Sequence, residues 1–131
     1  MLLNLEFWFR EAILQIEKEF PQALAFIGIA YILPETNRYY AYGQSINNAE
    51  ILPRSFGNVF EQCEICLGKP EFIHNDYCIG THIPELNFSF ATAVATPDPL
   101  ILVFLERFVE IFAHLIVEGT TRIEAYDFDP D

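Results

Sequence analysis

The residues of this chain that are best suited to chemistry gather in one short segment. All three cysteines and two of the three histidines fall there, in the pattern Cys63-x2-Cys66-x7-His74-x3-Cys78-x3-His82. Thiolates and imidazoles are the ligands that tetrahedral zinc prefers in proteins. The spacing therefore allows one structural zinc site, held by Cys63, Cys66, Cys78 and His82.

The start of this segment resembles the opening of a RING finger, on the string Cys63-Glu64-Ile65-Cys66-Leu67 with Cys78 and His82 beyond it. A RING finger needs later cysteine pairs to complete two zinc sites, and the chain lacks them. The alternative places Cys63 and Cys66 on the buried face of a helix, where cysteine behaves as a small hydrophobic residue. We favour this alternative because the turn residue Gly68 follows both cysteines. We therefore expect no metal and no other cofactor.

A nucleophilic pair of Cys78 with His74 or His82 is disfavoured, because the acidic neighbours oppose the thiolate that such catalysis requires. The chain also lacks a phosphate-binding glycine loop, a nucleophile elbow and a dinucleotide fingerprint. We therefore predict that the protein is not an enzyme.

Carboxylate pairs occur at Glu61 with Glu64 and at Glu106 with Glu110. Each pair fits a solvated helix face, because residues three or four apart lie side by side on a helix. The C-terminal Asp127-x-Asp129-x-Asp131 matches the first ligands of a calcium loop but lacks its glycine and its distal glutamate. None of these patterns predicts a catalytic or metal site.

Composition bounds the function more firmly than any motif does. The chain has 131 residues and a net charge of −12, yet 52% of its residues are hydrophobic, including 13 Phe, 6 Tyr and one Trp. Such a chain can bury a core and must then carry its charge on the surface. A strongly negative surface repels nucleic acid and attracts basic partners. With 7 basic residues, the chain cannot supply the phosphate contacts that nucleic-acid binding needs.

We expect a single domain over residues 1–131, because no linker, charge block or repeat divides the chain. Charged residues interrupt both the apolar N-terminus and the apolar stretch over 100–117, which argues against a signal peptide and a membrane span. The odd number of cysteines fits a reduced compartment. We expect a cytoplasmic protein that does not bind a membrane.

Apolar spacing predicts helices over residues 2–20, 56–67 and 98–118, the last ended by Gly119. Strands are predicted over 23–33, 38–44, 71–74, 77–83 and 86–96, with a short edge strand over 120–128 as a further expectation. The fold class is therefore α+β, with a mostly antiparallel sheet of about five strands flanked by N- and C-terminal helices. This element order, over residues 2–118, resembles that of GAF, PAS and profilin-type domains, whose terminal helices often pair in dimers.

Two of these elements have informative faces. The segment 86–96 alternates large residues with a row of small ones, which predicts that a helix approaches the small-residue face closely. The apolar arc of the helix over 98–118 is too wide for one contact with a sheet. We expect the N-terminal helix to cover part of it and a second protomer to cover the rest, giving a homodimer. Candidate residues for this layer are Leu5, Phe9, Phe104, Phe108, Phe112 and Leu115.

The predicted function is that of an acidic protein-binding module. Exposed tyrosines in an acidic surface make good anchors for a basic protein. In composition the chain resembles the small immunity and antitoxin proteins that bacteria use to neutralise toxins and nucleases. The alternatives are a GAF- or PAS-like sensor of a small ligand and, third, a zinc-stabilised adaptor. The candidate partner-binding residues are Tyr39, Tyr40, Tyr42, Asp127, Asp129 and Asp131.

Overall fold

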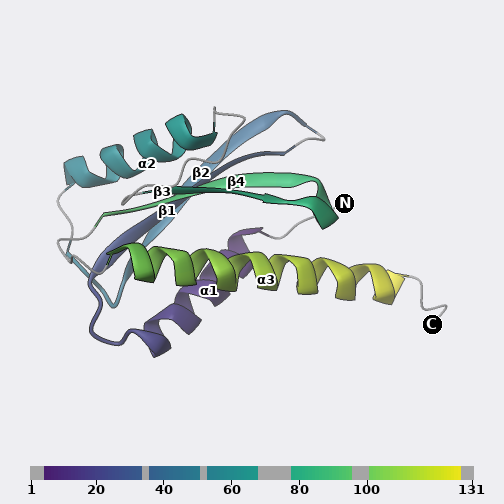
Figure 1. Cartoon of the computed structure of the whole chain (residues 1–131), viewed down its shortest axis with the longest axis horizontal. Helices are drawn as coiled ribbons and strands as arrows, with labels where there is room; N and C mark the ends of the chain where they lie inside the picture. Colours follow the sequence, from purple (N-terminus) through teal and green to yellow (C-terminus); the bar gives the residue numbers. More distant parts are fainter. Residues whose placement is uncertain (1–4, 34–35, 51–52, 68–77, 96–100, 128–131) are drawn as a thin grey trace.

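The computed structural model describes residues 5–33, 36–50, 53–67, 78–95 and 101–127. These residues form one antiparallel sheet between two helical layers (Figure 1). Helix α2 covers one face of the sheet, and helices α1 and α3 cover the other, which confirms the α+β class. In chain order the elements are α1 (Leu5–Glu19), β1 (Ala25–Leu33), β2 (Arg38–Ile46), α2 (Pro53–Leu67), β3 (Cys78–Ile83), the 3-10 turn η1 (Pro84–Leu86), β4 (Phe88–Ala95) and α3 (Ile101–Asp127).

The described residues contain four strands rather than about five, so the predicted number of strands needs correction. The segment 120–128, expected as an edge strand, continues helix α3 as far as Asp127. The strand expected over 71–74 lies outside the described residues. The other predicted strands are present with slightly different ends.

The strand order in the sheet is β2-β1-β4-β3, so β1 and β4 are neighbours although they are far apart in the sequence. At the centre, Ile29 of β1 lies between Tyr42 of β2 and Thr92 of β4, and Thr92 also pairs with Ile79 of β3. Strand β1 is buried on both faces over most of its length, which agrees with its continuous run of apolar residues. Strands β2 and β3 are left at the two edges of the sheet.

The core between the sheet and the helices α1 and α3 contains a cluster of aromatic rings among its aliphatic side chains. Phe9 of α1 makes edge-to-face contacts with Phe108 and Phe112 of α3, at centroid distances of 5.5 and 6.0 Å. Phe112 in turn contacts Phe90 of β4, with centroids 5.1 Å apart. Such pairs contribute about 0.5–1.5 kcal/mol each beyond the burial of apolar area. The aromatic cluster therefore joins all three elements in one core.

The opposite face of the sheet allows α2 to approach closely, as the row of small residues in β4 predicted. Ala91 and Ala93 are buried beneath α2 in one cluster with Val59 and Cys63. Gly28 of β1 shares this face, and a Cβ atom on it would lie only 2.5 Å from the Val59 side chain. Small side chains on the strands thus set the distance between α2 and the sheet.

The wide apolar arc of α3 is covered largely within the single chain. Helix α1 packs against α3 and crosses it obliquely in Figure 1, which confirms the expected pairing of the terminal helices. Of the six residues expected in the shared layer, five are buried and Leu115 is half-buried. Pairing with a second protomer stays a prediction.

Helix α3 runs past Gly119, although the sequence predicted that this glycine would end it. A Cβ atom at position 119 would lie 2.3 Å from the ring of Trp8 in α1, so the glycine makes room for this tryptophan. A glycine inside a helix costs only about 1 kcal/mol relative to alanine, which packing between α1 and α3 can offset. Although α3 is long, none of the helices in the described part of the chain is apolar enough to cross a membrane.

We expect Gly119→Ala to destabilise the protein by about 1–2 kcal/mol, because the gain in helix propensity is smaller than the cost of displacing Trp8. The matched control is Gly57→Ala in α2, where an added Cβ meets no atom within 4 Å. This control should stabilise the protein by about 0.5–1 kcal/mol. Urea unfolding followed by the fluorescence of Trp8, the one tryptophan of the chain, measures both. Equal stabilisation by the two variants would contradict the contact.

Candidate partner-binding site

The three tyrosines predicted to bind a partner do not share one surface. Strand β2 sends Tyr39 to the α2 side of the sheet, where its side chain is 48% exposed. Tyr40 and Tyr42 point to the other side, where Tyr40 stacks on Tyr31 with ring centroids 5.3 Å apart. Tyr42 lies edge-on against Phe9, with centroids 5.1 Å apart. Of the three, only Tyr39 is well exposed.

Tyr31 and Tyr42 lie in a largely apolar environment. Burial raises the pKa of the Tyr42 hydroxyl far above its ordinary value, and the nearby Tyr31 raises it further. Burial also raises the pKa of Tyr31. These hydroxyls therefore stay protonated in the folded protein, and the two rings are part of the core.

The structure does not describe the side chains of the three acidic C-terminal residues that were predicted to bind a partner. Asp127 is the last residue of α3. Asp129 and Asp131 lie outside the described residues. Their proposed contact with a partner stays a prediction.

Cys63 and Cys66 occupy the buried helix positions that the sequence predicted. Cys63 and Cys66 of α2 and Cys78 of β3 are all buried, and no disulfide joins them. The Cys63 thiol lies 3.5 Å from the carbonyl oxygen of Gly28. Burial raises the pKa of Cys63 to about 12, and the neighbouring Cys78 and Cys66 contribute to the shift. Such a thiol is a poor nucleophile at neutral pH.

The residues of the possible zinc site do not form a metal centre in the described structure. His82 is exposed on β3, and its Nδ1 shares a hydrogen bond with the Ser89 hydroxyl at 2.8 Å. Within the described ranges, no three His, Cys, Asp or Glu side chains are placed to hold a metal ion. His74 lies outside those ranges.

We expect the thiols of the native protein to react with Ellman's reagent only when the chain unfolds. Burial blocks access to all three, and the raised pKa of Cys63 removes its thiolate. The measurement compares the release of thionitrobenzoate in buffer and in urea, with and without a chelator. Rapid native reaction, or a lower unfolding midpoint in the chelator, would contradict the buried-thiol interpretation and favour a zinc site.

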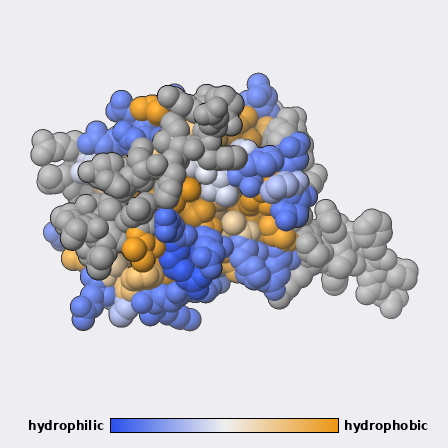
Figure 2. Space-filling model, in the orientation of Figure 1, coloured by the Kyte–Doolittle hydropathy of each residue, from blue (hydrophilic) through white to orange (hydrophobic). Residues whose placement is uncertain are grey.

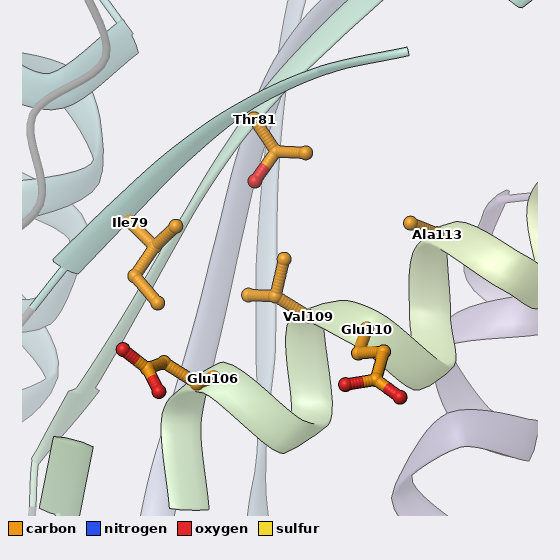
Figure 3. A pocket seen from close by; sticks show the side chains of 6 residues that line it. All are labelled: Ile79, Thr81, Glu106, Val109, Glu110 and Ala113. Atoms are coloured by element: carbon orange, nitrogen blue, oxygen red, sulfur yellow. The ribbon is translucent and has the colours of Figure 1, made fainter. Parts of the chain in front are cut away.

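A groove of about 440 Å³ lies between the edge strand β3 and helix α3. Strand alternation points Ile79 and Thr81 toward α3. Helical spacing brings four residues of α3 to the facing surface. These residues are Glu106, Val109, Glu110 and Ala113, and Figure 3 shows all six side chains around the groove.

The groove has an apolar floor and an acidic rim. Val109 is buried at its base beside Ile79, while Glu106 and Glu110 are exposed. Val103, 58% exposed, lies one turn before Glu106 on α3 and extends the apolar surface. Figure 2 shows separate hydrophobic areas at the surface, with hydrophilic areas between and around them. They lie at the level where the sheet faces α3 in Figure 1.

One arginine balances only part of the charge beside the groove. Arg107 binds both carboxylate oxygens of Glu19, at 2.8 and 3.0 Å, and binds Glu110 at 2.8 Å. Its hydrogen bonds lower the pKa of Glu19. Two carboxylates, those of Glu19 and Glu110, therefore share this one guanidinium, and Glu106 is a further exposed carboxylate of the rim. The rim therefore keeps a negative charge at neutral pH.

Sequence reasoning identified Glu106 and Glu110 as a helix pair but did not connect them with β3. Another feature it missed is Thr92 of β4, the register partner of Ile79. The Thr92 side chain is fully buried, and its hydroxyl has no hydrogen-bond partner among the described residues. The one sequence signal for the burial of Thr92 was the alternation of segment 86–96, which placed it on the same face as the large residues.

Comparisons with protein-family models, with curated proteins and with solved structures found no significant match. The groove, the edge strand and the surface charge are therefore the features that bear on function.

Proposed function

We propose that this protein is a non-enzymatic binding module of the immunity or antitoxin type, which neutralises a basic toxin or nuclease. The observation that carries this proposal is the groove between β3 and α3, with its apolar floor and its rim of Glu106 and Glu110. An apolar floor supplies affinity, and a charged rim supplies orientation and fast association.

The distribution of charge over the fold supports the same function. The glutamates whose side chains the structure describes are all exposed or half-exposed, so none of these carboxylates is buried by folding. Two of the basic side chains, Arg10 and Arg107, are held in ion pairs with glutamates. The surface thus offers a basic partner a strongly negative potential.

The alternative function is a GAF- or PAS-like sensor that encloses a small ligand and dimerises through its terminal helices. The groove volume falls in the range of small-molecule sites. However, the interface of the sheet with α1 and α3 is filled with aromatic rings such as Phe9, Phe90 and Phe112. The groove is also open to solvent rather than enclosed. These features favour a macromolecular partner over an enclosed ligand.

The test is co-expression with the basic proteins encoded next to this gene. We expect one of them to arrest growth alone, and this chain to restore growth and to co-elute with that protein at a fixed stoichiometry. An unrelated acidic protein of similar net charge is the control, because bulk charge alone should not restore growth. If no neighbouring basic protein binds this chain, the proposed function fails.

A further inference from the structure

The β3 edge of the sheet lies above the groove, and this distinguishes it from the β2 edge. Both strands end the sheet, and no strand among the described residues pairs with the outer side of β3. An edge strand presents backbone N–H and C=O groups that can pair with an added strand. At β3 this edge lies directly beside the groove, because Ile79 and Thr81 belong to both.

A segment added to β3 would place alternate side chains over the groove. Neighbouring strands lie about 5 Å apart, and their side chains alternate between the two faces of the sheet. The side chains on the α3 side would therefore stand next to Ile79 and Thr81 and above the rim of α3.

The spacing of the two rim carboxylates matches the repeat of a strand. Glu106 and Glu110 are one helical turn apart, a rise of about 6 Å. Residues two apart on a strand are separated by about 6.6 Å. Helix α3 and strand β3 run roughly alongside each other past the groove in Figure 3. Two cationic side chains at alternate positions of an added strand would thus reach the two carboxylates.

Lysine and arginine also suit the floor of the groove. Their methylene stems can cover Val109 and Ile79 while the charged ends stay at the solvated rim. A second copy of this chain is a poor occupant, because it would bring another net charge of −12 to the same acidic rim. Strand β3 itself contains no lysine or arginine that could meet the carboxylates.

We propose that the basic partner docks by adding an extended segment to the outer edge of β3, with lysine or arginine at two alternate positions over Glu106 and Glu110. This inference rests on the proposed function, since it specifies how the same partner is held. The partner segment would therefore contain three consecutive residues: a lysine or arginine, any residue that favours a strand, and a second lysine or arginine.

The test uses a fluorescent peptide of alternating lysine and valine and the full-length chain. Anisotropy gives the affinity for Glu106→Gln/Glu110→Gln and for the matched pair Glu61→Gln/Glu64→Gln on α2, which removes the same charge. We expect about tenfold weaker binding for the groove pair and a much smaller loss for the α2 pair. A peptide with alternate backbone amides N-methylated should also bind about tenfold more weakly, because it cannot complete the ladder.

Three results would overturn the inference: equal losses in the two pairs, a larger loss in the α2 pair beside Tyr39, or full binding of the methylated peptide. The basic protein found by co-expression is measured in parallel. If it binds but is insensitive to the groove pair, the docking mode is wrong while the proposed function stands. If neither it nor the peptide binds, both fail.

Discussion

Replacing Phe108 by aspartate should leave the chain unable to fold. The Phe108 ring is fully buried and lies against Phe9 and Phe112, so the substitution removes the centre of the aromatic core. The aspartate would also place a charge in a site that offers it no partner. The two effects together exceed about 4 kcal/mol, close to the whole stability of an ordinary domain.

Circular dichroism and urea unfolding measure this effect. The control is Val103→Asp, on the same helix but 58% exposed, which should change the stability by less than about 0.5 kcal/mol. Phe108→Leu, which keeps an apolar side chain, should leave a folded protein whose loss of stability can be quantified. A folded Phe108→Asp variant with a near-native midpoint would contradict the described packing of α1 on α3.

The periodicity of the sequence was sufficient to predict the layers. The row of small residues in β4 predicted a close helix, and α2 lies there over Ala91 and Ala93. The wide arc of the last helix predicted its pairing with the first, and Phe9 contacts Phe108. Both predictions succeeded because each face is encoded within one element.

The end of α3 could not be predicted in this way. Gly119 and the β-branched residues that follow are local signals that end helices or favour strands. Helix α3 nevertheless continues through Gly119. The ring of Trp8, a residue more than a hundred positions earlier, occupies the space beside this glycine. Such a contact becomes visible only once the two helices are placed together.

The groove could not be predicted for a similar reason. Its carboxylates were visible as a pair on a helix, but their neighbours depend on β3 being the strand at the edge. Because β4 pairs with the distant β1, strand order does not follow sequence order. The tyrosines of β2 illustrate the same limit, since alternation alone did not show that α2 leaves Tyr39 exposed while Tyr42 packs on Phe9.

The association rate with the basic partner should fall about a hundredfold as the ionic strength rises from about 0.01 M to about 0.5 M. The net charge of −12 draws the partner over long distances at low salt, when screening is weak. Once bound, the contacts at the groove lie within a few ångströms and are screened less. The dissociation rate should therefore change much less than the association rate.

Stopped-flow mixing with the partner identified by co-expression separates the two rates. The Glu106→Gln/Glu110→Gln and Glu61→Gln/Glu64→Gln variants carry equal net charge, so both should lower the association rate at low salt by a similar factor. Only the groove pair should speed dissociation, because only its carboxylates are expected to touch the partner. An association rate that does not respond to salt would contradict charge-steered capture. Tight binding to duplex DNA or RNA would contradict it as well, because a surface this acidic should repel both.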